Sequence, residues 1–392
     1  MAVSRREFIT QLAAAAGATA LGCRDTNDPD PDFGTGRIDH VIVVTMENRS
    51  FDHLLGWVPG ADGKQAGLSY VDESGIAHAT HHLTQFQTCF LADPSHSFEG
   101  GRSEYNEGAC DGWLRTPPND LLSIGYYEAG DLSFLGKAAS DWLVLDRYFC
   151  PVMGPTYPNR VASLSATIDR LTNTLTPSTL PTIWDRLLAA GLTGKNYASS
   201  AFASSTLWGT KYSSLIRPIT EFHTDAAQGK LPDVSFVDPV LTTDFGNSYH
   251  PPGDIRNAEL FLASVYKSVT LGPLWKRSLL IITFDEWGGF FDHVPPPAAQ
   301  IPQAEKDIGN DELRGFRVPT LLVSPYVKRR SVSSNVYDHS SVLRFIEKRW
   351  SLQSLTVRDA TANDLGDELD LSMAVTAAPE YDVPGPFAFT CS

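Results

Sequence analysis

After residue 22 the sequence lacks any apolar run long enough to cross a bilayer, which takes about 20 residues. It also lacks an excess of basic residues, because 31 lysines and arginines stand against 46 aspartates and glutamates, a formal net charge of -15. Proteins that bind a phosphate backbone usually carry a basic face, so the composition argues against a nucleic-acid ligand. An acidic protein that handles a phosphate group would need a cation to do so.

The N-terminus has the pattern of an export signal. An arginine pair precedes a short run of small apolar residues that is too short for a membrane span. The pattern resembles a twin-arginine signal, so residues 1-22 are predicted to direct export to the periplasm, the cell envelope or the medium. Two endings stay open: cleavage after the small-residue motif Ala18-Thr19-Ala20, or lipidation of Cys23, which would give a surface-anchored protein. Residues 23-36 are predicted to be a flexible linker.

Four further cysteines are present: Cys89, Cys110, Cys150 and Cys391. In an exported chain an even number of cysteines suits disulfide bonds. Three pairings are possible, of which Cys89 with Cys110 is the local one. The sequence has no CxxC pair, so a zinc-thiolate site is not expected.

The fold class follows from alternating strand and helix patterns. Runs rich in branched aliphatic residues predict buried strands at 38-45, 142-145, 278-283 and 318-324. Helical periodicity occurs at 183-190, 255-269 and 340-350. This alternation predicts an α/β fold with a mostly parallel sheet sandwiched by helices.

The domain organisation is predicted to be simple. One domain would span residues 37-392, and we see no internal repeat. Residues 60-135 and 195-250 show little periodicity, so they are predicted to form long loops or cap insertions over the strand ends.

The first polar cluster directly follows the first predicted strand. It reads Glu47-Asn48-Arg49-Ser50-Phe51-Asp52-His53. In open parallel sheets ligands bind beyond the carboxyl ends of the strands, and carboxylate and amide oxygens in that place suit a hard divalent cation. The alternative is a loop with an Asx turn and an exposed arginine.

The second cluster precedes a helix-like stretch and contains Gly154-Pro155-Thr156-Tyr157-Pro158-Asn159-Arg160. A hydroxyl near the start of a helix lies where free amides and the helix dipole favour an anion, so Thr156 is a candidate nucleophile toward a phosphoryl group. The alternative is that Thr156 is only an N-cap and Pro158 a first-turn proline.

The third cluster closes the strand at 278-283 and reads Asp285-Glu286-Trp287-Gly288-Gly289-Phe290-Phe291-Asp292-His293. Adjacent carboxylates repel each other unless a cation offsets their charge, and glycines let the backbone approach a ligand. Four histidines could contact phosphate oxygens or protonate a leaving alkoxide, although each taken alone could serve packing only: His96, His250, His293 and His339.

The three blocks, in this order, resemble the signature blocks of the bacterial phospholipase C and acid phosphatase phosphoesterase family over about residues 37-350. The resemblance implies an alkaline-phosphatase-like fold and one divalent metal ion, of unknown identity, with five ligands: Glu47, Asn48, Thr156, Asp285 and Glu286. It implies that Thr156 forms a covalent phospho-threonine. It also implies that His96 and His250 contact the phosphoryl group and that one of them protonates the leaving group. His293 is carried over as a substrate contact, and His339 without a defined role.

Phospholipase C-type hydrolysis of phosphatidylcholine-like lipids is therefore the predicted function. An acid phosphatase acting on phosphomonoesters is the alternative, although a threonine matches the phospholipase branch. The chain lacks the long C-terminal extension of the large secreted phospholipases C, which leaves its docking on a lipid surface open. A sulfatase-like or phosphomutase-like hydrolase is disfavoured because no Cys-x-Pro-x-Arg run occurs. A non-catalytic surface lipoprotein that binds a ligand would be expected to have lost parts of these blocks, and all three are complete.

Overall fold

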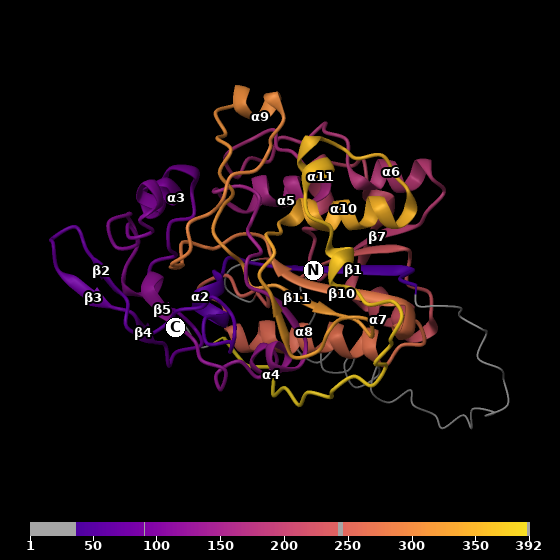
Figure 1. Cartoon of the computed structure of the whole chain (residues 1–392), viewed down its shortest axis with the longest axis horizontal. Coiled ribbons are helices and arrows are strands. Elements are labelled where there is room, and N and C mark those ends of the chain that lie inside the picture. Colours follow the sequence, from indigo (N-terminus) through magenta and orange to yellow (C-terminus); the bar gives the residue numbers. More distant parts are fainter. Residues whose placement is uncertain (1–36, 90, 242–245, 390–392) are drawn as a thin grey trace. The chain divides into compact units, whose positions relative to one another are not determined.

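The first aliphatic run forms strand β1 (His40–Met46), which lies inside an eight-stranded sheet in a computed structural model of the chain (Figure 1). Two parallel neighbours flank β1: β10 (Ser278–Phe284) on one side and β9 (Val234–Asp238) on the other. Six of the seven residues of β1 are buried, as expected for a strand covered on both faces. The register pairs Thr45 with Thr283, so the segments that follow β1 and β10 leave the sheet side by side.

The strand order is β12-β6-β11-β10-β1-β9-β7-β8. The strands not yet introduced are β6 (Leu143–Leu145), β7 (Gly194–Ala198), β8 (Ile216–Pro218), β11 (Leu321–Val323) and β12 (Ser331–Ser333). Every pairing in this sheet is parallel except the two that β11 makes with β10 and β6. The predicted α/β fold with a mostly parallel sheet is confirmed.

Helices cover both faces of the sheet (Figure 1). One face carries α5 (Thr156–Ser165), α6 (Ile183–Ala189), α10 (His339–Trp350) and α11 (Val357–Thr361). The other carries α4 (Leu135–Asp141), α7 (Ile219–Gln228) and α8 (Ile255–Thr270). The predicted helices at 183-190, 255-269 and 340-350 are thus α6, α8 and α10.

The segment between β1 and α4 gathers beside the edge at which β1 ends (Figure 1). It contains α2 (Phe51–Leu55), α3 (Phe98–Tyr105) and two small sheets, which are made of β2 (Ser69–Val71), β3 (Ala77–Ala79), β4 (His81–His82) and β5 (Gly125–Tyr126). The short helix α9 (Gln303–Asp307) lies in the loop between β10 and β11. Six short 3-10 helices complete the described elements: Asn106–Gly108, Leu121–Ile124, Ser204–Trp208, Ser213–Leu215, Trp275–Arg277 and Leu365–Glu368.

The structure describes residues 37-389 apart from residues 90 and 242-245. These residues belong to one compact unit. The predicted signal at 1-22, the linker at 23-36 and Cys23 lie outside the described residues, so these predictions are unchanged. Among the described residues no helix combines the length and the hydropathy that crossing a bilayer requires.

One sequence prediction about the sheet was wrong, and one strand runs in a direction that the sequence did not specify. The segment 195-250 is not mainly a cap, because it supplies β7, β8 and β9 to the central sheet. These strands are short and polar in part, so they lack a long aliphatic run. The run at 318-324 forms β11, which is antiparallel: the chain stays at the edge where β10 ends and re-enters the sheet from there, whereas a parallel strand would need a crossover to the opposite edge.

The local pairing of Cys89 with Cys110, one of the three that the sequence left open, is not formed. Cys110 and Cys150 are buried free thiols, whereas Cys89 is disulfide-bonded, so its partner lies outside the described residues.

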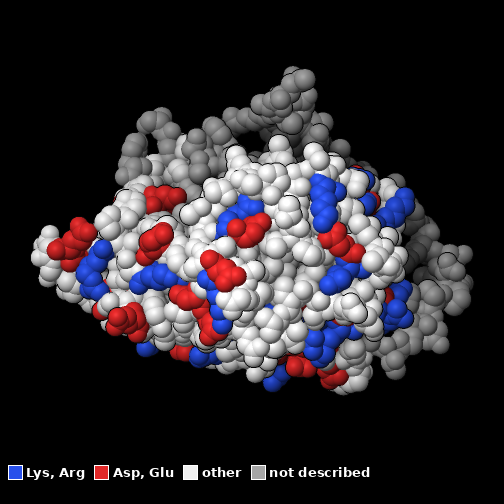
Figure 2. Space-filling model, turned by 90° about the horizontal axis from the view of Figure 1, so that it is seen from above, with Lys and Arg blue, Asp and Glu red and all other residues white. Residues whose placement is uncertain are grey.

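On the face shown in Figure 2, lysine and arginine side chains are intermixed with aspartate and glutamate. The described part of that face therefore carries no large patch of one sign.

The sheet core should dominate stability. Ile42 in β1 is fully buried, whereas Ile76 is 58% exposed. We expect Ile42→Ala to lower the free energy of unfolding by about 2–5 kcal/mol, because it leaves a cavity between the two helical layers. The matched control Ile76→Ala should change it by less than about 0.5 kcal/mol. Urea titration of both variants tests the difference, and equal losses would contradict the assigned position of β1.

Candidate active site

The loops that follow β1 and β10 are joined directly. The amide of Asp285 donates to the Met46 carbonyl oxygen at 3.0 Å, and the amide of Asn48 donates to Asp285 Oδ1 at 3.2 Å. Glu47, Asn48, Asp285 and Glu286 are all buried. The predicted convergence of the first and third clusters at one edge of the sheet is confirmed.

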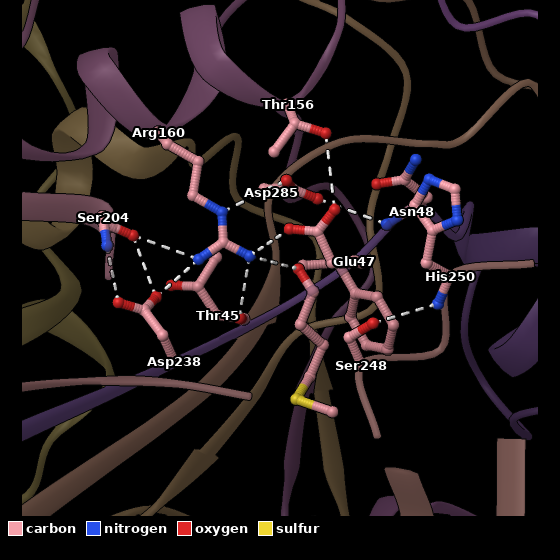
Figure 3. A network of polar contacts seen from close by, with 12 residues as sticks. Thr45, Glu47, Asn48, Thr156, Arg160, Ser204, Asp238, Ser248, His250 and Asp285 are labelled. Atoms are coloured by element: carbon pink, nitrogen blue, oxygen red, sulfur yellow. Dashed lines mark hydrogen bonds and ion pairs between the residues drawn. The ribbon is translucent and has the colours of Figure 1, made fainter. Parts of the chain in front are cut away.

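Arg160, on α5, holds this group of carboxylates together (Figure 3). Its guanidinium is fully buried and donates to Glu47 Oε1 at 2.5 Å, Asp238 Oδ1 at 2.6 Å and Asp285 Oδ2 at 3.2 Å. It also donates to the Thr45 carbonyl oxygen at 3.1 Å. Neighbouring carboxylates raise the pKa of Arg160 despite its burial, which lowers it, so the arginine remains a cation.

Thr156 is the first residue of α5 and is 6% exposed. Its hydroxyl donates to Glu47 Oε2 at 3.3 Å (Figure 3). The N-cap position belongs to Pro155, which makes no side-chain capping bond. The capping alternative for Thr156 is therefore wrong, and its hydroxyl points into the carboxylate cluster.

Sequence reasoning missed Asp238, because its strand β9 falls in the segment interpreted as a cap. Asp238 accepts hydrogen bonds from Ser204 Oγ at 2.9 Å and from Asn196 Nδ2 at 2.8 Å, besides the ion pair with Arg160. The signal was present, since residues 234-238 read Val-Ser-Phe-Val-Asp, an apolar run that ends in an acid as the other site strands do.

The cluster contains oxygen atoms without hydrogen-bond partners, which could bind a cation. Asn48 Oδ1 and Glu286 Oε1 are buried and have no hydrogen-bond partner. Burial and then the neighbouring carboxylates raise the pKa of Asp285 and Glu286 well above the ordinary range, and burial raises that of Glu47. Because Arg160 is the one cation that pairs with these carboxylates in the described part of the chain, the oxygen-rich donor set fits a hard divalent cation.

The two candidate histidines lie together but present different chemistry. Both Nδ1 atoms bond to backbone carbonyls, His96 to Pro94 at 2.8 Å and His250 to Pro251 at 2.5 Å, so each Nδ1 carries a proton. His96 Nε2 lies 3.4 Å from Asn48 Nδ2 and accepts a hydrogen bond from it. The other polar atom of the Asn48 side chain, Oδ1, takes no part in this bond. Burial lowers the pKa of His96.

His250 is partly exposed. Its side chain is 13% exposed, and Nε2 lies 3.8 Å from Asp93 Oδ2. The ring centroids of His96 and His250 are 6.0 Å apart. His250 Nε2 therefore lies beside the carboxylate of Asp93 rather than against a backbone carbonyl, as Nδ1 does.

His293 belongs to a second network. Its Nδ1 donates to Asp52 Oδ2 at 2.5 Å, and Arg317 bonds both Asp52 Oδ1, at 3.0 Å, and Asp292 Oδ1, at 2.9 Å. Among the described contacts of His293, none involves Thr156 or a predicted metal ligand. The substrate role carried over to His293 stays a prediction that these contacts do not support.

His339 begins α10 and reaches the site from behind. Its Nε2 donates to the Asp285 carbonyl oxygen at 3.0 Å, while Nδ1 accepts from the Tyr148 hydroxyl at 3.1 Å. Burial lowers the pKa of His339 to about 4, so the ring is neutral. It fixes the backbone of Asp285.

Two groups outside the cluster bring three ligand atoms within 4.8 Å of one another: Asp93 with His96 and His250, and Asp52 with Asp292 and His293. Arg317 and His293 already neutralise much of the second group. The cluster around Glu47 differs because two of its buried oxygens have no partner.

Comparison with known proteins agrees with this geometry. A model of the Phosphoesterase family matches residues 38–353. The chain belongs to that family and is an enzyme that hydrolyses phosphoric esters. The family that the three blocks predicted is confirmed.

Two relatives show the extent of the similarity. Non-specific phospholipase C6 of Arabidopsis thaliana is 30% identical over 379 residues, which cover 84% of this chain and 72% of that protein. Phospholipase C A of Mycobacterium tuberculosis is 26% identical over 444 residues, which cover 93% of this chain and 85% of that protein.

Among solved structures, a protein in the alkaline phosphatase superfamily from Vibrio parahaemolyticus aligns with 94% of this chain and 81% of its own at 10% identity and a TM-score of 0.39. That likeness is too weak to add to the fold that the sheet itself shows.

Gly288 gives a test of the geometry. Its φ is +67° and its amide donates to Glu286 Oε2 at 2.6 Å, while an added Cβ would lie 2.3 Å from the Asn48 carbonyl oxygen. We expect Gly288→Ala to weaken Mn²⁺ binding by about 10–100-fold, because Asn48 has to move.

The matched control is Gly75→Ala, since Gly75 has a φ of +81° with nothing within 4 Å of an added Cβ. Both variants carry the left-handed backbone cost of about 1–2 kcal/mol, but only Gly288→Ala displaces a proposed ligand. Isothermal titration calorimetry that finds equal Mn²⁺ affinities would exclude Asn48 as a ligand.

Proposed function

We propose that this protein is a phospholipase C-type enzyme that cleaves the phosphodiester of phosphatidylcholine-like lipids through a transient phosphorylated Thr156. One observation carries the proposal: the Thr156 hydroxyl bonds to Glu47 inside a buried anionic cluster that has two unpartnered oxygens. The names of the two relatives, both phospholipases C, support the substrate class.

The proposed ligands are those that the family resemblance implied: Glu47, Asn48, Thr156, Asp285 and Glu286. A divalent cation bound there would withdraw charge from the phosphoryl oxygens and favour ionisation of the threonine hydroxyl. Arg160 and His339 keep the ligands in place from below, through the carboxylates of Glu47 and Asp285 and the Asp285 carbonyl oxygen.

Thr156 is oriented for attack by its own helix. Its hydroxyl hydrogen points to Glu47 Oε2, which can accept the proton as the oxygen bonds to phosphorus. The position at the N-terminus of the ten-residue helix α5 favours the negative charge of the phosphoryl group. The bond between phosphorus and the diacylglycerol oxygen breaks in this step.

His250 is the proposed acid for the leaving group. Its Nε2, which lies 3.8 Å from Asp93 Oδ2, would give a proton to the departing diacylglycerol oxygen. In the second step a water would bond to phosphorus and give a proton to the same nitrogen. The bond between phosphorus and Thr156 Oγ1 would break to release phosphocholine, and Glu47 would return its proton to that oxygen. His96 serves differently, by orienting the Asn48 amide.

The substrate class is tested by comparing phosphatidylcholine, sphingomyelin and p-nitrophenyl phosphate with and without chelator. We expect phosphocholine to be released from phosphatidylcholine, the monoester to be hydrolysed more slowly, and both activities to be lost with chelator and restored by a divalent cation. Turnover of the monoester alone would establish the phosphatase alternative. Turnover of none would favour the non-catalytic lipoprotein.

Thr156→Ala should lower kcat by about 10³–10⁶-fold, because the attacking oxygen is removed. The free energy of unfolding should change by only about 0.5–1.5 kcal/mol, the contribution of one hydrogen bond, since Thr156 caps no helix. Thr156→Ser keeps the hydroxyl and should retain measurable turnover. Full activity of the alanine variant would mean that water attacks phosphorus directly.

A further inference from the structure

Arg49, in the first polar cluster, is a fully buried cation whose bonds all go to neutral groups. Among the described residues it forms no ion pair. Its Nε donates to the Tyr249 carbonyl oxygen at 3.0 Å and its Nη2 donates to the same oxygen. Its Nη1 donates to His53 Nε2 at 3.2 Å, and the Phe290 ring lies 4.3 Å from the guanidinium carbon. Burying an arginine without a carboxylate is costly, so its fixed contacts call for a reason.

The target of Arg49 is a strained backbone. Tyr249 has a φ of +81°, a left-handed conformation that is uncommon for a bulky residue and persists only where its surroundings enforce it. Two donors from Arg49 on one carbonyl oxygen supply that enforcement at the backbone of Tyr249. The next residue along the chain is His250.

Tyr249 is also held at its other end. Its hydroxyl donates to Glu259 Oε1, and Glu259 is itself a buried carboxylate on α8 without an ion-pair partner among the described residues. Glu259 Oε2 accepts from the amides of Phe134 and Leu135, the latter at 3.0 Å, at the start of α4. The tyrosine is thus fixed at its carbonyl by the β1 loop and at its hydroxyl by α8.

The amide of Arg49 completes the connection by donating to the Glu286 carbonyl oxygen at 3.1 Å. One residue therefore joins the β1 loop, the β10 loop and the segment that carries His250. We propose that Arg49 and Glu259 are positioning residues, which clamp Tyr249 so that His250 Nε2 faces the leaving oxygen. The inference rests on the proposed function, in which His250 is the leaving-group acid.

This role predicts a dependence on the leaving group that a merely structural role does not. An alkyl alcohol such as diacylglycerol needs a proton as it leaves, whereas p-nitrophenolate leaves without one. A misplaced His250 should therefore slow the hydrolysis of phosphatidylcholine and spare p-nitrophenylphosphorylcholine. General acids contribute about 10²–10⁴-fold to rate, which sets the size of the effect.

The experiment compares kcat on these two substrates for Arg49→Lys, Tyr249→Phe and His250→Ala. We expect Arg49→Lys to lose at least about tenfold on phosphatidylcholine and less than about threefold on the nitrophenyl ester, within the range set by acid catalysis. Tyr249→Phe removes only the bond to Glu259, so it should show the same pattern with a smaller loss. It also keeps the test possible if Arg49→Lys does not fold.

Arg358→Lys is the matched control, because Arg358 is also buried but pairs with Glu305 on another part of the fold. It should affect both substrates alike. Equal losses on both substrates for Arg49→Lys and Tyr249→Phe would overturn the positioning role while the wild-type enzyme and Thr156→Ala still support the function. Absence of leaving-group dependence in His250→Ala overturns it as well. Turnover of neither substrate by the wild type overturns both.

Discussion

The ion pairs of Arg160 with three carboxylates are the interaction on which the site depends. Glu47, Asp238 and Asp285 end three strands of one sheet, and their charges would repel one another at the edge where the strands stop. A single guanidinium, buried on α5, bonds to one oxygen of each. Removing one partner from such a buried network typically lowers the free energy of unfolding by about 3–5 kcal/mol. Arg160 is therefore as necessary to the structure of the site as the proposed ligands are.

Arg160 does not bond to every oxygen atom of the cluster. The oxygen atoms that remain are the ones proposed to act in the chemistry of the site. The bonds of Arg160 occupy Glu47 Oε1 and Asp285 Oδ2, which leaves Glu47 Oε2 to the Thr156 hydroxyl. The unpartnered oxygens of Asn48 and Glu286 remain. The same helix therefore contributes the cation that holds the carboxylates and, one turn earlier, the hydroxyl proposed to attack phosphorus.

The residues of the polar cluster after β1 have two roles: some face the proposed site, and others hold the surrounding loops in place. Glu47 and Asn48 face the proposed cation, and Arg49 fixes the loop that carries His250. Ser50 donates from its hydroxyl to the Phe291 carbonyl oxygen at 2.6 Å, and Asp52 accepts from Arg317 at 3.0 Å. Consecutive residues thus tie the β1 loop to the β10 loop from several sides, which holds the proposed ligands rigidly in relation to one another.

Much of the fold and of the candidate site could be predicted from the sequence. Buried parallel strands are recognisable as aliphatic runs, and the polar residues that follow such strands lie at one edge of the sheet. Glu47 and Asp285 were placed together on that basis. Asp238 was not, since β9 and β7 are short and partly polar and only the three-dimensional pairing reveals them. The histidines were harder still. His293 follows an aspartate of the third cluster yet serves the Asp52 network, whereas His339, remote in sequence, reaches the Asp285 carbonyl oxygen through the fold.

The direction of β11 and the partner of Cys89 could not be predicted from the sequence for the same reason. Each depends on which segments meet in space, and local pattern carries no information on that. One interpretation of the first cluster made Arg49 an exposed arginine in a loop. The burial of Arg49 and its two bonds to the Tyr249 carbonyl oxygen appear only in the folded chain.

The central claim is that the oxygen atoms of the cluster that do not bond to Arg160 hold one divalent cation beside Thr156. A crystal structure of the protein grown with Mn²⁺, with anomalous data collected at the manganese edge, tests it most directly. The account predicts one strong peak within about 2–2.6 Å of side-chain oxygens of the five proposed ligands, Glu47, Asn48, Thr156, Asp285 and Glu286. No peak there, or a single peak between Asp93, His96 and His250, would contradict it.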